Sequence, residues 1–308
     1  MCAYNGLPYI KEAVACVLNQ TYTNWELLIG DDGSADGTRA WLQEQLADNP
    51  KVKLYIHSKN LGYVGNKNFL HREATGEYIT QLDNDDTCPA DRLEKQVQAM
   101  LAHPGLKMVA GGYTRIDDQG KEYGTVALAA AEMILQKPEE GYPFWFPSLL
   151  VHRSVFDEVG YFDTYFAGLL GDDLYWTVKA NARYPIYCLK DLVYGYRNNP
   201  NSITNDYNNV RKLIMPAVLQ RLFEQRKERG TDVLEQNDLP AMQQLEAGLM
   251  ANKQFMAEQY RIWAAKAVDK NDLALASHLL KKAVKLNPFN LTIANTYVYW
   301  LKRKLQSG

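Results

Sequence analysis

Tyr78-Ile79-Thr80-Gln81-Leu82-Asp83-Asn84-Asp85-Asp86 is a short apolar run that ends in three carboxylates within four residues. The apolar part alternates and is rich in strand-forming residues, which predicts a β-strand. Carboxylates crowded at the end of a strand repel one another, and a hard divalent cation with oxygen ligands is the natural partner that offsets the repulsion. Because a cation held there can grip a diphosphate, the stretch points to chemistry on a phosphorylated donor.

Strand-like and helix-like patterns alternate on both sides of this stretch. Residues 1–3, 25–29 and 52–56 read as strands, and helical spacing of apolar residues follows each of them, as it does again after Pro89. This alternation predicts an α/β fold with a mostly parallel sheet flanked by helices. Ligands of such sheets bind beyond the carboxyl ends of the strands. Tyr4-Asn5, Asp31-Asp32 and the acidic stretch all lie at such ends, so we expect them to converge on one rim.

The remainder of the chain changes in character near residue 205. Residues 107–116 read as a strand, Tyr142-Pro143-Phe144-Trp145-Phe146-Pro147 as an aromatic loop, and Asp172-Asp173 as the opening of a helix. Beyond residue 205 glycine becomes scarce, and helices are predicted over 210–228, 240–268, 273–286 and 291–305. The last two resemble one tetratricopeptide-type hairpin. We therefore predict an α/β domain over 1–205 and an all-helical C-terminal region over 206–308.

Composition excludes several classes of protein. The 308 residues are 46% hydrophobic and 23% charged, as in soluble globular proteins. The formal net charge of −2 gives no overall basic field, so we expect no nucleic-acid partner. Four cysteines without metal-ligand or redox spacing read as free thiols in a reducing compartment. No apolar run approaches the ~20 residues of a membrane span and no signal peptide precedes the first motif, which favours a cytoplasmic protein.

Four segments over the first two-thirds of the chain resemble the family 2 glycosyltransferases, which have a Rossmann-like GT-A fold. They are Tyr4-Asn5-Gly6, then Asp31-Asp32-Gly33-Ser34-Ala35-Asp36-Gly37-Thr38, then Asn60-Leu61-Gly62 through Gly76-Glu77-Tyr78-Ile79 into Asp83-Asn84-Asp85-Asp86, and finally Gly160-Tyr161-Phe162-Asp163 with Asp172-Asp173. The third ends in the family's Asp-x-Asp-Asp, and the fourth matches the segment that carries the catalytic base. The resemblance implies an inverting, metal-dependent transfer of a sugar from a nucleotide-diphosphate sugar to a hydroxyl group.

The sequence departs from the family pattern at three places. Members usually have several more strand residues before the position of Met1. The family's Glu-Asp base motif is Asp172-Asp173 in this chain. Many members place a His in the loop after Tyr-Arg, where Asn199 stands here. Since imidazole binds such metals better than a carboxamide does, metal affinity or the ligand set is expected to differ.

The resemblance also implies roles for single residues in donor binding. Tyr4 would stack beside the nucleobase, Asp32 would accept its imide N–H, and Lys67 would neutralise donor phosphate. Asp83 would meet the ribose, and Asp85, with Asn199 as a doubtful second ligand, would hold Mn²⁺ or Mg²⁺. The expected nucleotide-sugar-binding set is Ala3, Tyr4, Asn5, Asp31, Asp32, Lys67, Asp83, Asn84 and Asp86. The alternatives are that Asp31 and Asp32 shape a turn and cap a helix, that Lys67 is a solvated helix charge, and that the acidic stretch is a capped loop.

Catalysis would need a carboxylate that removes the acceptor's proton. Asp173 aligns with the Asp of the family's Glu-Asp pair and is the expected base, with Asp172 as the second candidate. Two acids at the start of a helix also favour the helix dipole, which is the alternative interpretation. Trp145 and Phe146 are weak candidates for an acceptor platform and Trp176 for the pocket wall, although core packing explains all three equally.

The expected partners follow from this chemistry. The donor would be a UDP-sugar first and a dTDP-sugar second, and the acceptor a carbohydrate or a lipid-linked glycan of the cell envelope. Residues 297–304 combine aromatic side chains with three cations, which suits peripheral membrane contact at the inner face. Docking onto the catalytic domain, or a homo-oligomer through the helical region, is the competing expectation. Two rival functions are a degenerate transferase that acts as a scaffold and a nucleotidyltransferase, but the latter normally has a Gly-rich basic loop, which Asn5-Gly6-Leu7-Pro8 does not provide.

Overall fold

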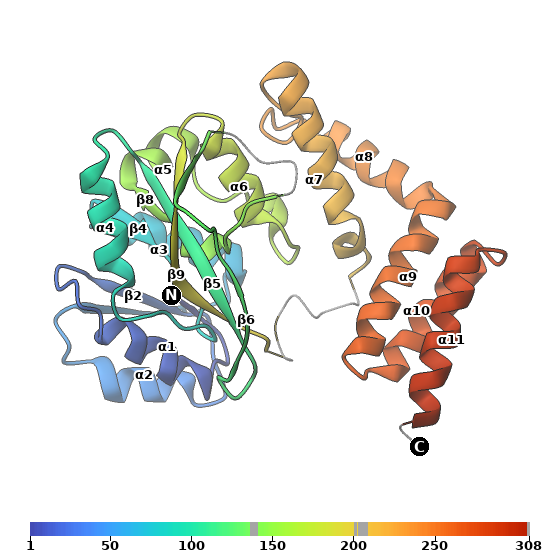
Figure 1. The fold of residues 1–308 in the computed structure, drawn as a ribbon, viewed down its shortest axis with the longest axis horizontal. Helices are drawn as coiled ribbons and strands as arrows, with labels where there is room; N and C mark the ends of the chain where they lie inside the picture. The colour runs from blue at the N-terminus through green and yellow to red at the C-terminus, as the bar shows by residue number, and fades with distance from the viewer. Residues whose placement is uncertain (136–140, 200–201, 203–208, 307–308) are drawn as a thin grey trace. The chain divides into compact units, whose positions relative to one another are not determined.

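The computed structural model describes residues 1–135, 141–199, 202 and 209–306 of the chain. The chain divides into two compact units, Met1–Gly168 with Asp172–Ile203, and Leu169–Gly171 with Thr204–Gly308. The boundary predicted between 205 and 206 lies outside the described residues. The α/β class and the helical C-terminal region are confirmed (Figure 1).

The first unit begins with a parallel three-stranded sheet in the order β1-β2-β3. Its strands are β1 (Cys2–Ala3), β2 (Leu27–Asp31) and β3 (Val52–Ile56), and each is followed by a helix: α1 (Tyr9–Leu18), α2 (Thr38–Leu46) and α3 (Gly62–Glu73). All five residues of β2 are buried, as its continuous apolar run predicts. Ile10 and Val14 of α1 share one core cluster with Ile29 and with Leu42 of α2.

The second sheet of this unit has the order β4-β8-β5-β9-β7, with β6 paired to β5. The strands are β4 (Tyr78–Thr80), β5 (Met108–Ile116), β6 (Glu122–Val126), β7 (Glu132–Ile134), β8 (Leu150–His152) and β9 (Ile186–Arg197). The pair β5–β9 is parallel, whereas β4–β8, β5–β8, β5–β6 and β7–β9 are antiparallel. The first sheet and the β5–β9 pair form the parallel part that the sequence predicts, and β4, β6, β7 and β8 add antiparallel pairs to it.

Helices and short 3₁₀ turns surround this second sheet. They are α4 (Arg92–Ala102), η1 (Phe146–Ser148), α5 (Arg153–Val159), η2 (Thr164–Phe166) and α6 (Asp172–Asn181). Val97 and Met100 of α4 pack with Val109 of β5 and Leu150 of β8 in one cluster. Helix α6 starts at the two acids that the sequence placed at a helix opening.

A cavity of about 540 Å³ is lined by residues of both sheets. Its walls include Leu28 of β2 and Ile79 of β4, and Met1 and Cys2 line one part of it. The Met1 ammonium group donates to the Leu28 carbonyl oxygen at 2.8 Å.

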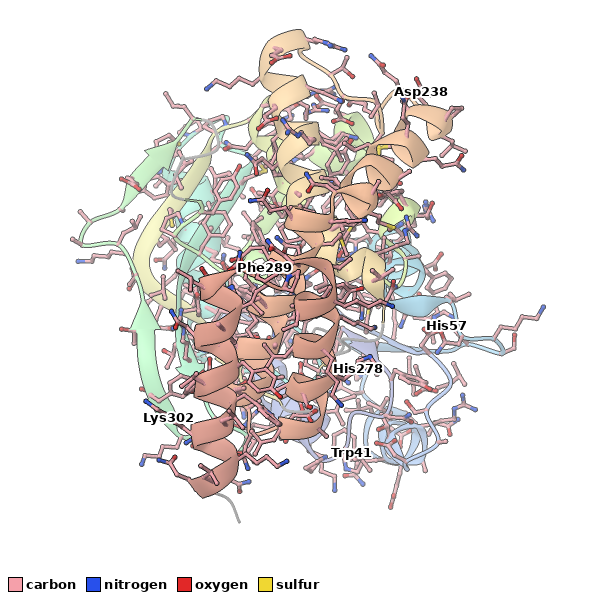
Figure 2. The ribbon with its side chains drawn as sticks, turned by 90° about the vertical axis from the view of Figure 1, so that its right-hand side faces the viewer. Trp41, His57, Asp238, His278, Phe289 and Lys302 are labelled. Carbon is pink, nitrogen blue, oxygen red and sulfur yellow. The ribbon has the colours of Figure 1, made fainter. Side chains whose placement is uncertain are left out.

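The second unit consists of the helices α7 (Val210–Arg229), α8 (Leu239–Ala251), α9 (Lys253–Asp269), α10 (Leu273–Leu286) and α11 (Leu291–Gln306). Three of the predicted ranges match α7, α10 and α11 within one residue. The single helix predicted over 240–268 is wrong, because Asn252 leaves the helical conformation (φ −75°, ψ 97°) and its side chain accepts a hydrogen bond from the Phe255 N–H. The hairpin of α10 and α11 shares a core cluster with Ala257 of α9, and its side chains are drawn in Figure 2.

Candidate active site

The turn after β1 is tied to the loop after β2. The backbone N–H of Asn5 donates to the Ser34 hydroxyl oxygen at 2.9 Å, and the side-chain amide oxygen of Asn5 accepts from the Ala35 N–H at 2.8 Å. Ala3 is buried, whereas the Tyr4 side chain is 55% exposed beside this turn. Tyr4 is thus free to contact a ligand at the rim, as the nucleobase-stacking prediction requires.

Asp31 and Asp32 are both buried at the end of β2. Asp31 forms an ion pair with Arg39 at 2.8 Å, and one oxygen of Asp32 accepts from the Leu61 N–H, at the start of α3, at 2.7 Å. These contacts are those of the turn-shaping and helix-capping alternative. Contact of Asp32 with a nucleobase stays a prediction.

The acidic stretch is fastened to the end of β9. Asp86 is buried, and its two oxygens accept from the Tyr194 hydroxyl and from the Arg197 N–H, each at 2.7 Å. Burial raises the pKa of Asp86 well above its usual value, and the charges of Asp83 and Asp85 add to the effect. Asp86 therefore acts as an anchor for the loop, and its contact with a nucleotide sugar stays a prediction.

Gly195 makes this attachment sterically possible. Thr87 and Gly195 exchange two backbone hydrogen bonds, of 2.9 Å and 2.8 Å, in an isolated antiparallel bridge. A Cβ atom at position 195 would overlap the Thr87 hydroxyl oxygen. A glycine at this position lets the loop that carries the carboxylates lie directly against the strand.

Asp83 and Asp85 remain directed toward the rim. The Tyr63 hydroxyl donates to Asp83 at 3.1 Å, and the Asn199 amide donates to Asp85 at 2.8 Å. Burial, followed by the negative charge of Asp85, raises the pKa of Asp83 to about 6. The structure thus brings Asn199 to Asp85, the two residues that the sequence suggested as metal ligands.

Asn84 connects the acidic stretch to the turn after β1. A Cβ atom at Gly6 would overlap the Asn84 side-chain amide. The two segments can pack this closely because Gly6 has no side chain. The ends of β1 and β4 therefore lie against each other, although the two strands belong to different sheets.

The residues predicted to hold a metal ion form only part of a ligand set. Among the residues that the structure describes, no group of three or more His, Cys, Asp and Glu side chains is arranged to hold one ion. Asp83 and Asp85 nevertheless repel each other, which is seen in the raised pKa of Asp83, and they offer hard oxygen donors. A Mg²⁺ or Mn²⁺ ion bound by one or two carboxylates, with waters and substrate phosphate as its other ligands, fits such a set.

Asp172 and Asp173 have different surroundings although they are neighbours in the chain. The Asp172 carboxylate is buried in an ion pair with Lys67, whose side chain is 2% exposed. Burial alone would lower the pKa of Lys67, but the charges of Asp172 and Asp173 raise it. The interpretation of Lys67 as a solvated helix charge is wrong, because α3 turns this residue inward, where its ammonium lies 3.8 Å from the ring centre of Phe162.

Asp173 is the residue predicted to act as the general base. Burial, with the charge of Asp172 second, raises its pKa to about 7, and the charge of Asp83 also contributes. One of its oxygens accepts from the Leu174 N–H at 2.7 Å. A carboxylate that titrates near neutral pH is well matched to proton abstraction.

Two neighbouring cavities reach these groups. Tyr63, Lys67 and Asp83 line one end of the 540 Å³ cavity, and Asp173 lines a smaller pocket. His71 and Ile79 belong to the walls of both. Asp83 and Asp173 thus lie on either side of shared wall residues, with the Lys67 ammonium in electrostatic contact with both.

The three aromatic acceptor candidates separate in the structure. Trp176 is buried, its indole N–H donates to the Gly160 carbonyl at 2.7 Å, and its ring stacks on Phe156. These are packing contacts, and Trp176 also lines the small pocket of Asp173, as expected for the pocket wall. Phe146 lines the small pocket of Asp173. Trp145 packs against Tyr196 with 4.4 Å between ring centres, and its buried indole N–H has no hydrogen-bond partner among the described residues.

Sequence reasoning missed the side chains that hold the acidic stretch in place. Tyr63 and Tyr194 contact Asp83 or Asp86 through their hydroxyl groups, and Arg197 donates to the Asp85 carbonyl at 2.6 Å and forms an ion pair with Glu12. The alternation of Tyr194-Gly195-Tyr196-Arg197 marks a strand, but nothing in it identifies the partner. That partner is more than 100 residues away in the chain for both Tyr194 and Arg197.

Comparisons with known proteins agree with this geometry. The sequence profile of "Glycosyl transferase family 2" matches residues 1–160. An uncharacterized glycosyltransferase of Haemophilus influenzae is 36% identical over 42% of this chain and 51% of its own length. The Escherichia coli protein "UDP-Glc:alpha-D-GlcNAc-diphosphoundecaprenol beta-1,3-glucosyltransferase WfgD" is 36% identical over 38% of this chain and 46% of its own length. The matched part therefore spans about half the length of these relatives.

Solved structures resemble the chain over a longer range. S. aureus TarS 1-349 in complex with UDP-GlcNAc has a TM-score of 0.57 at 17% identity, over 97% of this chain and 90% of that one. The same protein in complex with UDP has a TM-score of 0.56 at 18% identity, with the same coverage. At this level of identity the likeness concerns the fold.

Proposed function

Because the chain belongs to glycosyl transferase family 2, we propose that it is an inverting, metal-dependent glycosyltransferase that uses a nucleotide-diphosphate sugar. The observation that carries this proposal is the single charge network around Lys67. Its ammonium interacts with Asp83 of the acidic stretch and with Asp172 and Asp173 of the base segment. A donor-binding carboxylate and a base for the acceptor would thereby come together from segments about 90 residues apart.

The donor would lie along the rim. Asp85 and Asn199 are the residues that would hold Mn²⁺ or Mg²⁺, and the ion would supply positive charge for the departing diphosphate. Tyr4 offers an exposed ring for the nucleobase. A UDP-sugar is favoured, because the printed names of WfgD and of the TarS complexes refer to UDP-Glc, UDP and UDP-GlcNAc. A dTDP-sugar is the second choice.

Asp173 would remove the proton of the acceptor hydroxyl as the oxygen attacks the anomeric carbon. Asp172 would hold Lys67 beside it and keep a negative charge close to Asp173, which raises the pKa of that carboxyl. Attack from the side opposite the diphosphate inverts the anomeric centre. Phe146, in the wall of the Asp173 pocket, would contact the acceptor.

The acceptor is proposed to be a carbohydrate or a lipid-linked glycan of the cell envelope. The names of two relatives support this class: WfgD, and the "Putative teichuronic acid biosynthesis glycosyltransferase TuaG" of Bacillus subtilis, which is 36% identical over 32% of this chain and 39% of its own length.

The test is transfer or hydrolysis of UDP-Glc and UDP-GlcNAc with Mn²⁺ present and after its removal. Asp85→Ala and Asp173→Asn should each reduce turnover by roughly 10²–10⁴-fold, whereas Asp157→Asn, at an exposed acid of α5, should have wild-type turnover. Wild-type turnover in both of the first two variants would refute the site assignment. Calorimetry with UDP distinguishes the enzyme from the scaffold alternative. The enzyme should bind UDP in a metal-dependent way, whereas the scaffold alternative predicts no such binding.

A further inference from the structure

The hairpin of α10 and α11 has a charge unlike that of the rest of the chain. Residues 273–306 contain six of the 34 Lys and Arg residues and none of the 36 Asp and Glu residues. The hairpin is therefore +6, and the other residues, with 28 basic against 36 acidic side chains, are −8. Such an asymmetry points to an anionic partner for this segment.

The cations lie toward both ends of the hairpin. Lys281, Lys282 and Lys285 occupy the last turns of α10, and Lys302 to Lys304 occupy the last turns of α11. Figure 2 shows Phe289 at the loop that joins the two helices and Lys302 toward the opposite end of α11. Since consecutive helices joined by a short loop run antiparallel, their carboxyl-terminal turns lie at opposite ends.

An apolar stripe runs along α11 between these cations. Leu291, Val298, Leu301 and Leu305 follow one another at intervals of 7, 3 and 4 residues, the spacing of one helix face. Their side chains are 81%, 49%, 40% and 83% exposed. The opposite face of α11 carries the buried residues Ile293, Thr296 and Trp300, so the hairpin already has its own core.

The loop end of the hairpin adds one more exposed apolar group. Phe289 is 93% exposed, directly before the stripe begins. Exposed large apolar side chains that are flanked by lysines are the pattern of a surface that enters the headgroup region of a bilayer, where the apolar groups insert and the cations meet anionic lipid.

We propose that the α10–α11 hairpin docks the protein on an anionic membrane surface, with Phe289 and the α11 stripe inserted and the lysines against lipid phosphates. A second copy of the chain is a poorer occupant, because two hairpins of +6 repel each other at close range. Nucleic acid would use the lysines but would leave the leucines and Phe289 exposed. Among the described residues no helix is long and apolar enough to cross a bilayer, so this contact is peripheral.

The test is co-sedimentation of the full chain with vesicles. Phosphatidylcholine mixed with phosphatidylglycerol should bind the protein, whereas pure phosphatidylcholine should bind it at least tenfold more weakly. High salt should release it, because the electrostatic part is screened. Equal binding to both vesicles, or no binding to either, would overturn the proposal. Neither result depends on turnover, so the proposed function is tested separately.

Variants identify the surface. Lys281→Gln, Lys285→Gln and Lys302→Gln combined should weaken binding to the anionic vesicles about 100-fold, at about fivefold for each cation near the surface. The matched control combines Lys59→Gln, Lys227→Gln and Lys253→Gln, which neutralise three exposed lysines outside the hairpin. It should change binding to the anionic vesicles less than about threefold. An equal loss in both triple variants would show that net charge alone acts, and the proposal would fail.

A second pair of substitutions tests insertion. Leu301→Gln with Leu305→Gln should weaken vesicle binding about 100-fold or more, at roughly 1.5–3 kcal/mol for each buried leucine side chain. Circular dichroism should stay unchanged because both side chains are exposed. A concentration-dependent dimer in light scattering that this variant abolishes would assign the stripe to a second copy. Binding of duplex RNA as tight as binding of the vesicles would assign the lysines to nucleic acid. Either outcome would overturn the membrane proposal.

Discussion

Asp173, the proposed base, should lower the stability of the folded protein near neutral pH. The fold raises its pKa from 3.8 to about 7, so the folded protein binds this proton more tightly than the unfolded chain does. The stabilising contribution is complete below pH of about 4 and is lost as the pH rises toward 7. Asp173→Asn removes the titration, and its Tm relative to wild type should rise by about 2 °C or more between pH 5 and pH 8. Scanning calorimetry measures this difference, and a constant difference at both pH values would contradict it. The control is Asp157→Asn.

Removing one charge of the Lys67–Asp172 ion pair should destabilise the protein far more than removing both charges. Both side chains are buried, so Lys67→Met leaves a buried carboxylate unpaired and should lower the free energy of unfolding by about 3–5 kcal/mol. The double variant Lys67→Met with Asp172→Leu removes both charges and should lose less than the sum of the single changes. Urea denaturation of Lys67→Met, of Asp172→Leu and of the double variant gives the free energy of coupling between the two side chains. Strict additivity would mean that the two charges do not support each other.

At this scale the sequence was informative where chemistry leaves a pattern. Carboxylates placed directly after a predicted strand led to Asp83 and Asp85, and the family resemblance led to Asp173. Tyr63 and Tyr194, which bind the acidic stretch through their hydroxyl groups, are two of twenty tyrosines, and no spacing distinguishes them from tyrosines that only pack.

Strand β9 is the element that holds the acidic stretch in position, and Gly195 is the residue of β9 at which a substitution should disturb this attachment most. Gly195→Ala would place a methyl group on the Thr87 hydroxyl and push the acidic stretch off the strand. We expect turnover to fall at least tenfold, the scale on which misplacement of catalytic groups by about 1 Å acts. Thr87→Ala should restore most of the loss when it is combined with Gly195→Ala, because it removes the overlapping oxygen.

The control for this pair is Thr87→Ala alone, which keeps both backbone hydrogen bonds between the loop and β9 and should have turnover within about threefold of wild type. If the double variant is as impaired as Gly195→Ala, the cause is strand flexibility and not steric overlap. Steady-state kinetics with saturating Mn²⁺ distinguishes the two.

Element boundaries were predictable where the signal is local. The sequence places α10 and α11 within one residue, since Asp272 and Asn290 cap them through local hydrogen bonds. The break at Asn252 was missed, although asparagine is a favoured cap, because apolar periodicity continues across it. The antiparallel pairing of β4 with β8 was missed for a different reason: alternation shows that a strand exists but not which strand lies beside it.

On the scale of the whole molecule, acidic side chains gather at the rim, and the charged side chains of the α10–α11 hairpin are all basic. The rim depends on residues from positions 3 to 199, so it exists only when the first unit is folded. Any ligand that binds the rim must therefore stabilise the folded chain by mass action. This links the proposed chemistry to a measurement that needs no acceptor.

UDP together with Mn²⁺ should raise the Tm of the intact protein. At a ligand concentration of about 100 times the Kd the gain is about 2.7 kcal/mol, which corresponds to a shift of about 5–10 °C for a unit of roughly 200 residues. Removal of the metal with EDTA should abolish most of the shift, and so should Asp85→Ala, because the diphosphate then meets Asp83 and Asp86 without a cation. Asp173→Asn is the matched control, since the base acts on the acceptor and its loss should leave the shift intact. A shift that survives both EDTA and Asp85→Ala would mean that the nucleotide binds elsewhere.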